Sequence, residues 1–191
     1  MLFRAFILKA SEGRTAPDFS LRSLAGPGRM DLIARCIVAS FYTLEGPRRD
    51  TALTVVLEGP PDPPVSLTFD GERMRRAPVG EVGAAEIVFD VLSGKKVEGV
   101  RKERKGFERV ASEYRERGFS LYYLHEEGED SSKVRFEGSS AFILGDQKGL
   151  DAGSERFLDE VRTKRVSLGP HSYLASHCIA IINNELDRLE R

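Results

Sequence analysis

Short apolar runs alternate with stretches of helical periodicity along this chain, and that alternation limits the folds open to it more than any other feature. The apolar runs expected to form strands are 2–9 (LFRAFILK), 53–57 (LTVVL), 120–124 (SLYYL), 141–144 (AFIL) and 165–168 (RVSL). Apolar residues at three- and four-residue steps predict helices over 29–44, 81–92, 107–117, 154–164 and 173–189. Nearly continuous apolar strands are typical of sheets covered by helices on both faces. An α/β fold with a mostly parallel sheet is therefore expected.

Two segments interrupt this alternation. The proline-rich stretch 58–64 (EGPPDPP) fits neither a helix nor a sheet ladder and predicts a rigid, extended connection. The run 65–69 closes on Asp70-Gly71, a tight-turn signal, so it is expected to form half of a hairpin at the sheet edge.

The run 94–109 carries seven Lys or Arg and three Glu, a local net charge of +4. It fits either the solvated face of a helix or a surface that contacts RNA phosphates.

Composition excludes several classes of protein. With 191 residues, 40% of them hydrophobic and 31% charged, the chain fits one compact domain over residues 1–191. Lys and Arg number 29 against 30 Asp and Glu, and this balance argues against a histone-like protein that binds nucleic acid through bulk charge. Two cysteines and three dispersed histidines form neither a disulfide framework nor a metal-ligand cluster, so no metal is expected. No apolar run is long enough to span a membrane, and a cytoplasmic protein is expected.

Several familiar catalytic and nucleotide-binding motifs are missing. The sequence contains no G-x-x-x-x-G-K-[ST], no G-x-G-x-x-G after the first strand and no G-x-S-x-G, which disfavours P-loop, dinucleotide-binding and α/β-hydrolase proteins. Three loops after predicted strands carry glycine or polar residues instead, at 124–126, 144–146 and 167–170. Because the carboxyl ends of parallel strands meet at one edge of a sheet, these loops are expected to form a ligand site. The alternative is that Gly145 and Gly169 only make tight turns.

Several stretches in combination resemble one family of enzymes. They are 28–32 (GRMDL), 48–51 (RRDT), 57–64 (LEGPPDPP), 69–71 (FDG), 142–146 (FILGD), 167–170 (SLGP) and 183–188 (NNELDR). Together they resemble the archaeal tRNA pseudouridine-54 N1-methyltransferases of the SPOUT class, over essentially the whole chain. The resemblance implies a parallel sheet with a C-terminal trefoil knot, a homodimer, S-adenosylmethionine as cofactor and the T-loop of tRNA as substrate.

The same resemblance implies where the cofactor binds. Its contacts are expected at Leu124, Gly145, Leu168, Gly169, Pro170, His171, Ser172, Tyr173 and Cys178. These residues lie in or near the three loops that the strand pattern places at one edge of the sheet. Cys178 also falls on an apolar stripe of the last predicted helix, which comprises Leu174, Cys178, Ile182, Leu186 and Leu189. A buried, inert thiol that contacts the ligand is therefore expected, rather than a nucleophile.

The reaction implied by the resemblance moves a methyl group from a sulfonium to N1 of pseudouridine, a nitrogen that carries a proton at neutral pH. Proximity and alignment supply on the order of 7–11 kcal/mol, so a strong base is not required. If a base acts, Asp31 is the expected residue, with Arg35 one turn further along the helix to hold a phosphate or polarise the base. The open alternative is that Asp31 only complements the dipole of its helix.

Three other functions stay open on the sequence. The first is N1-methylation of pseudouridine in ribosomal RNA. The second is a non-catalytic RNA-binding or ribosome-assembly role on the same fold. The third is methylation of a small molecule, which would proceed on a free nucleoside without the salt dependence of RNA binding.

Overall fold

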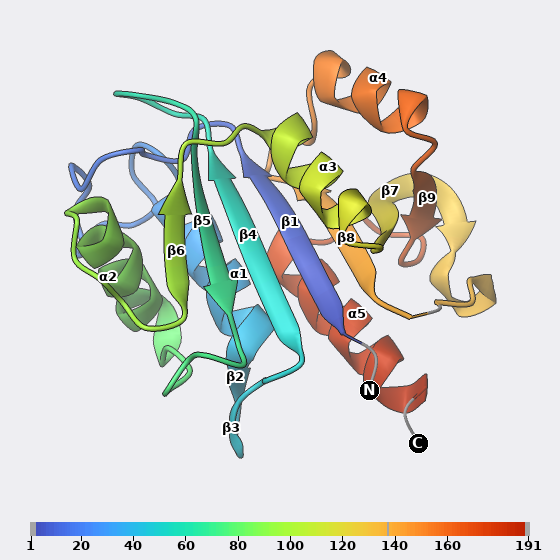
Figure 1. Ribbon diagram of the computed structural model, residues 1–191, viewed down its shortest axis with the longest axis horizontal. Helices are drawn as coiled ribbons and strands as arrows, with labels where there is room; N and C mark the ends of the chain where they lie inside the picture. Colours follow the sequence, from blue (N-terminus) through green and yellow to red (C-terminus); the bar gives the residue numbers. More distant parts are fainter. Residues whose placement is uncertain (1–2, 137, 190–191) are drawn as a thin grey trace.

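Seven strands form one sheet at the centre of the molecule, in the order β6-β5-β4-β1-β8-β7-β9 (Figure 1). The structure is a computed structural model that describes residues 3–136 and 138–189. The strands are β1 (Arg4–Ala10), β4 (Thr51–Leu57), β5 (Val65–Asp70), β6 (Val100–Glu103), β7 (Ser120–Asp130), β8 (Ser140–Gly145) and β9 (Lys164–Ser167). β1, β4, β7, β8 and β9 pair in parallel, whereas β5 and β6 are antiparallel to their neighbours. The predicted α/β fold with a mostly parallel sheet is confirmed; residue 2 of the predicted first strand lies outside the described residues.

Helices cover both faces of this sheet. α1 (Met30–Phe41), α2 (Gly80–Leu92) and α5 (Ala175–Leu189) lie on one face, and α3 (Phe107–Glu116) and α4 (Ala152–Glu160) lie on the other. Figure 1 shows α3 crossing in front of β1 and β8, with α1 and α5 behind the sheet. The remaining elements are the short strands β2 (Tyr42–Thr43) and β3 (Gly46–Pro47) and the 3₁₀ turn η1 (Ser131–Lys133). In the part of the chain that the structure describes, no helix has the length and apolar character needed to cross a membrane.

The two central strands explain why the sequence selects a covered sheet. Every residue of β1 and of β4 is buried, because helices pack on both sides of them. Side chains alternate between the faces, so Phe6 and Leu8 enter the core beneath α1 and α5, while Ala5 and Ile7 pack beneath α3. Burial on both faces removes the need for polar alternation, and nearly continuous apolar runs result.

The strand at one edge of the sheet differs from the one that the sequence pattern predicts. β5 was expected at the edge, but it lies between β4 and β6 and pairs with both. The edge strand is β6, which falls within the basic run 94–109. The interpretation of this run as a solvated helix face is therefore wrong for most of its length, since only residues 107–109 belong to a helix, α3. Val97 and Val100 pack against the core, and the charged residues 101–103 follow Val100 along the strand.

The apolar stripe predicted for the last helix is offset from the observed one. α5 buries Ser176, Ile179, Ile182, Asn183 and Leu186 against the rest of the fold. Leu174 precedes the helix and is 53% exposed, and Leu189 at its end is 58% exposed. Ile182 and Leu186 are thus correctly predicted core residues, whereas the two leucines at the ends of the stripe do not belong to the core of one chain.

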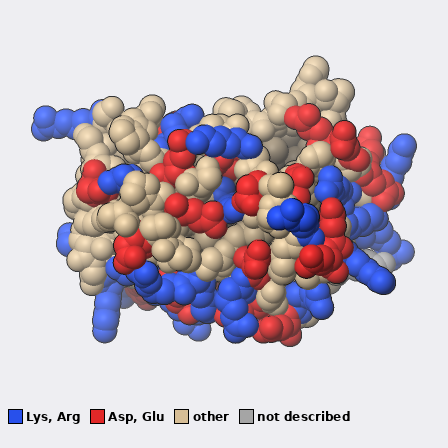
Figure 2. All heavy atoms as spheres, turned by 90° about the horizontal axis from the view of Figure 1, so that it is seen from above, with Lys and Arg blue, Asp and Glu red and all other residues tan. Residues whose placement is uncertain are grey.

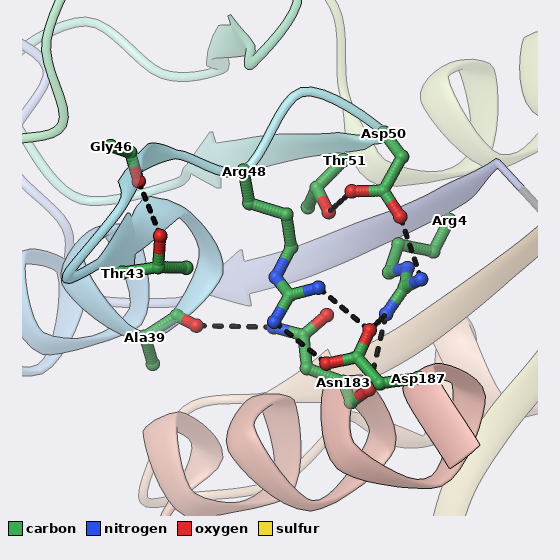
Figure 3. A network of polar contacts seen from close by, with 9 residues as sticks. All are labelled: Arg4, Ala39, Thr43, Gly46, Arg48, Asp50, Thr51, Asn183 and Asp187. Atoms are coloured by element: carbon green, nitrogen blue, oxygen red, sulfur yellow. Dashed lines mark hydrogen bonds and ion pairs between the residues drawn. The ribbon is translucent and has the colours of Figure 1, made fainter. Parts of the chain in front are cut away.

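A partly buried polar network joins the first strand to the last helix (Figure 3). Arg4 of β1 is fully buried, and its guanidinium contacts the carboxylates of Asp50 at 2.6 Å and Asp187 at 2.7 Å. Arg48 donates to both carboxylate oxygens of Asp187, at 2.7 and 2.9 Å. The backbone carbonyl of Asn183 accepts a further bond from Arg4 at 3.1 Å. Through these contacts α5 is fixed to the amino end of β1 and to the start of β4.

Candidate active site

Two adjoining cavities open at the carboxyl ends of β7, β8 and β9, at the edge of the sheet where the sequence predicts a ligand site. The smaller has a volume of about 110 Å³ and the larger about 590 Å³. Both are bordered by Leu124, Ser172, Tyr173 and Cys178, so they form one continuous site. The three predicted loops therefore do come together.

Eight of the nine residues predicted to contact the cofactor line this site. Leu168, Gly169 and His171 border the smaller cavity, and Gly145 borders the larger. Pro170 lines neither cavity, and its side chain is exposed. The proline lies in the correct loop, next to Gly169 and His171, but contributes no surface to the space that they enclose.

The loop after β8 needs glycine at its first position. A Cβ at Gly145 would lie 2.4 Å from the carbonyl carbon of Gly149, because the loop folds back on itself there. Asp146 holds the turn in place: its carboxylate accepts hydrogen bonds from the backbone N–H of Ser11 at 2.7 Å and of Lys148 at 2.9 Å. Gly145 thus does more than end a strand, since it permits the close backbone approach that shapes the larger cavity.

The loop after β9 has a similar requirement. Gly169 has a φ of +128°, a conformation that residues with a side chain rarely adopt. The hydroxyl of Ser167 lies 3.2 Å from the carbonyl of Gly169 and 3.4 Å from its N–H, which fixes the turn. The chain then passes through Ser172 and Tyr173 along the cavity and enters α5.

Cys178 borders both cavities from the first turn of α5. Burial raises the pKa of its thiol to about 11, so the reactive thiolate is scarce at neutral pH. Its Sγ lies 3.8 Å from the backbone carbonyl of Tyr173. The geometry agrees with the expected inert thiol, although the side chain is half-buried at the cavity wall rather than enclosed in the core.

An interruption of β7 brings two further polar residues into the site. Leu124 and Glu129 both pair with Val166 of β9, so residues 125–128 bulge out of the strand. His125 and Glu126 consequently border both cavities. The sequence pattern ended this strand at Leu124 and placed the loop 124–126 at the expected ligand site, but it did not predict that the strand resumes at Glu129. The signal that could have marked the bulge is Gly128, where a Cβ would lie 2.4 Å from the backbone nitrogen of Val166.

An arginine at the start of α1 forms part of the wall of the larger cavity. Arg29 has a φ of 45°, rare for a residue with a side chain, and it borders the cavity together with Leu32. Asp31 accepts two bonds from Arg29, at 2.9 and 3.0 Å, and one from Arg35 at 2.8 Å. Asp31 and Arg35 are therefore in contact, as expected from their spacing. Neither of them lines the cavity; the residue they hold there is Arg29.

The charge of Asp31 follows from these contacts. Hydrogen bonding to Arg29, reinforced by Arg35, outweighs the effect of burial and lowers the pKa of the carboxyl to about 2. Asp31 is thus ionised throughout the neutral range, but a carboxylate this acidic has little affinity for a proton. The arrangement holds an arginine in place better than it accepts a proton from a substrate.

Comparison with known proteins decides the family. A family model described as "Putative SAM-dependent RNA methyltransferase" matches residues 3–191. The chain belongs to this family. This methyltransferase is 37% identical over 199 residues to a protein of Methanocaldococcus jannaschii, with 97% of each chain covered. It is 40% identical over 202 residues to a protein of Pyrococcus abyssi, with 97% of this chain and 98% of the relative covered. Both relatives are named tRNA (pseudouridine(54)-N(1))-methyltransferase.

A solved structure supports the fold of this methyltransferase. Nep1 of Archaeoglobus fulgidus, bound to S-adenosylhomocysteine, matches it with a TM-score of 0.66 and 17% sequence identity, and 99% of each chain is covered. At that identity the likeness concerns the arrangement of the elements.

The cofactor of this methyltransferase is S-adenosylmethionine, and the chemistry of the site suits it. Leu124, Val166 and Leu168 give an apolar wall of the kind that holds a flat, weakly polar purine ring. The tight turns at Gly145 and Gly169 bring backbone amides and carbonyls close to the same space. The part of the chain that the structure describes holds no group of three or more His, Cys, Asp or Glu suited to a metal ion.

Proposed function

We propose that this methyltransferase methylates N1 of pseudouridine 54 in the T-loop of tRNA. The observation that carries the proposal is the pair of adjoining cavities: the Gly169 turn borders the smaller one, and the Gly145 turn and Arg29 border the larger one. Full-length relatives that bear this activity in their names support the substrate. The apolar pocket suits the cofactor, the cationic wall suits the RNA, and the two adjoin, so the methyl donor and the base can meet.

Bound S-adenosylmethionine supplies a methyl group made electrophilic by its sulfonium. We place it against Leu124, Gly145, Leu168–Tyr173 and Cys178, with Pro170 acting only through the shape of its loop. The base enters the larger cavity, and extrusion of a base from folded RNA is the usual way for an enzyme to reach such an atom. Tyr173, 37% exposed at the boundary of the two cavities, offers an aromatic face for stacking.

We infer that Arg29 contacts the RNA and that Asp31 and Arg35 act through it as positioning residues. The bidentate pair with Asp31 fixes the guanidinium of Arg29 at the cavity wall. There it can hold a phosphate or polarise a carbonyl of the base, so that N1 loses its proton more readily. The assignment of Asp31 as general base stays a prediction, and its pKa of about 2 favours the positioning role instead.

We further infer that the C-terminal segment forms a trefoil knot within a single domain. The strand order supports this, because β8 lies between β1 and β7 while β9 lies beyond β7. From β9 the chain returns along the cavity to α5, which packs against α1 on the other side of the sheet. Such a path passes the ends of β7 and β8, where the loops that line the site are also found.

A homodimer in the cytoplasm completes the proposal. Leu174 and Leu189 leave apolar surface at both ends of α5, on a helix whose inner face is already packed. A second copy of the chain would cover such surface. The two cysteines, Cys36 and Cys178, are free thiols, as expected in a reducing compartment.

Mass spectrometry of RNA from a deletion strain tests the proposed substrate. We expect N1-methylpseudouridine to disappear from the T-loop of tRNA while ribosomal RNA keeps its modifications. Unchanged tRNA together with an altered ribosomal nucleoside would overturn the proposal and favour a ribosomal substrate. If neither RNA changes although the purified protein binds S-adenosylmethionine, a small-molecule substrate is favoured; if it binds no cofactor, a scaffold role is favoured.

A further inference from the structure

A separate cavity lies on the α3 side of the sheet, away from the two cavities of the cofactor site. Its volume is about 410 Å³, and it opens between α3 and the strands β5 and β6. It exists because α3 packs over β1 and β7, while the part of the sheet formed by β5 and β6 has its helix, α2, on the opposite face. We call this cavity the α3 groove and define it by Thr68, Arg101, Glu113, Tyr114 and Arg117.

The α3 groove and the cofactor site lie at opposite ends of the sheet. Phe3 and Ala52, at the amino ends of β1 and β4, border the groove, whereas Gly145 and Leu124 border the cofactor site. β1 has seven residues, so the two sites are separated by about 20 Å or more at roughly 3.3 Å per residue. A ligand that occupies both must be at least this long, which fits a folded RNA.

Arg117 gives the groove a positive charge that the protein does not neutralise. Its guanidinium lies over the rings of Tyr114 and Phe119, with centroid distances of 5.3 and 5.4 Å. Among the described residues, no carboxylate lies within 4.0 Å of it, although most arginines and lysines nearby have one. Stacking on two rings orients the group while its hydrogen-bond donors remain free for an anion.

The remaining walls supply further cationic and hydroxyl groups. Arg101, on the edge strand β6, is 63% exposed and contacts Glu103 at 2.8 Å. Thr68 and Tyr114 border the groove, and both bond to the buried Thr54 beneath it: the hydroxyls of Thr54 and Thr68 lie 3.0 Å apart, and that of Tyr114 lies 3.0 Å from Thr54. Thr68 is the most exposed of these three residues, since Thr54 and Tyr114 are buried. An anion in the groove would thus meet the guanidinium groups of Arg101 and Arg117 and a hydroxyl donor. The two carboxylates of the lining have cationic partners of their own: Asp70 contacts Arg73, and Glu113 contacts Lys105 and Arg109.

The side of the molecule that carries α3 is rich in cationic side chains. Figure 2, seen from above Figure 1, shows lysine and arginine side chains gathered along its lower edge, which is the side of the molecule that carries α3. The groove itself is bordered by Val100 and Arg101 of the basic run 94–109, to which the sequence gave two interpretations. An open groove with cations on its rim suits a phosphodiester backbone better than a small enclosed ligand.

We propose that the α3 groove binds a backbone phosphate of the RNA substrate, at a position distant from the methylated base. The proposal rests on the proposed function, because it concerns a second contact with the same RNA. Arg117 is its main residue, and Arg101 and Thr68 assist. The contact anchors the folded RNA at the amino ends of the strands while the T-loop reaches the site at the carboxyl ends.

Charge reversal in α3 provides a matched test. Arg117→Glu changes the groove, whereas Arg115→Glu makes the same change of charge two residues away, outside the groove. Binding of unmodified tRNA is measured over a range of salt concentrations, with S-adenosylmethionine affinity and thermal stability measured on each variant. We expect Arg117→Glu to weaken tRNA binding at least fivefold more than Arg115→Glu and to reduce the salt slope by about one. Cofactor affinity should stay within twofold of the unmodified protein.

A second variant and a kinetic readout keep the test decisive if Arg117→Glu unfolds. Arg101→Glu, on the exposed edge strand, should weaken tRNA binding in the same direction, and KM for RNA should rise with kcat unchanged at saturation. Equal tRNA affinity in the Arg101, Arg117 and Arg115 variants would overturn the proposal that the α3 groove binds RNA. A wild-type protein that binds no tRNA would instead contradict the proposed function, so the two failures are distinguishable.

Discussion

Arg4 and Asp187 lie 183 positions apart in the sequence, yet their side chains meet at 2.7 Å and join the first strand to the last helix. Arg4 is fully buried, so it depends on carboxylates to compensate its lost hydration. Asp187 also binds Arg48, which places one carboxylate between two guanidinium groups. Part of the cofactor site is built from the loop that precedes α5 and from the first turn of that helix, so this distant network supports the position of the site.

We expect Asp187→Asn to destabilise the protein by about 1–2 kcal/mol at pH 7. This loss of stability is small for the removal of a charged partner, because the Asp187 side chain is 40% exposed and solvent partly screens its charge. Urea denaturation measures the change. Glu185→Gln, which removes a carboxylate from the same helix, should change the free energy of unfolding by less than about 0.5 kcal/mol.

The same pair predicts a dependence of stability on pH. Burial would raise the pKa of Asp187, but hydrogen bonds from Arg48 and Arg4 outweigh it and leave the pKa below its usual value. A carboxyl with a lowered folded-state pKa stabilises the fold above its unfolded pKa of about 4, and this contribution is lost as the pH falls through the folded value. The difference in unfolding free energy between wild type and Asp187→Asn should therefore be smaller at pH 3 than at pH 5. A gap that stays constant between these pH values would contradict the ion pair.

Asp31→Asn should lower the rate of methylation without removing the cofactor. Loss of the bidentate contact frees Arg29, and misplacement of a group at the reaction site costs up to about 100-fold in rate. We expect kcat/KM for RNA to fall about 10- to 100-fold while S-adenosylmethionine affinity changes by less than threefold. The control is Glu81→Gln, a carboxylate 3.7 Å from Arg35 that does not reach Arg29. Equal kinetics in the two variants would remove Asp31 from the mechanism.

The pH profile separates a base from a positioning residue at Asp31. With a pKa of about 2, this carboxyl is ionised at every pH at which the enzyme is assayed, so it adds no acidic limb to kcat between pH 5 and pH 8. An acidic limb near pH 6 that Asp31→Asn abolishes would support a general base and contradict the positioning role.

Gly145→Ala should weaken cofactor binding at least tenfold. The added Cβ would lie 2.4 Å from the backbone of Gly149, so the turn that shapes the larger cavity has to move. Gly83→Ala in α2 is the matched control, because a Cβ there meets nothing within 4 Å and cofactor affinity should be unchanged. Isothermal titration calorimetry compares the two. Undiminished affinity in Gly145→Ala would show that this turn is not part of the cofactor site.

Much of the fold follows from the sequence because it depends on local burial. The runs within β1, β4 and β8 are almost entirely apolar, and strands covered by helices on both faces are typically of this kind. The edge position of β6 was not predictable in this way. Its four residues, VRKE, are mostly charged, and they become a strand only because β5 offers a partner on that side.

The cofactor loops were predictable and the RNA-facing residues were less so. At Gly145 a close backbone approach excludes a side chain, and at Gly169 the backbone conformation does so. Such positions are visible in the sequence because they require glycine. The choice of Asp31 and Arg35 followed helical spacing, and they do pair. Spacing could not reveal that Arg29, with its left-handed backbone, is the residue that reaches the cavity.

The most direct test is a methylation assay on two T-loop RNAs that differ at one nucleotide, with pseudouridine in one and uridine in the other. Only pseudouridine has a ring N–H at the target position, because its carbon-linked ring leaves N1 free. We predict that the purified protein with S-adenosylmethionine methylates the pseudouridine RNA at N1 and leaves the uridine RNA unmodified. Equal methylation of both RNAs, or methylation of neither by a protein that binds the cofactor and the RNA, would contradict the assigned reaction.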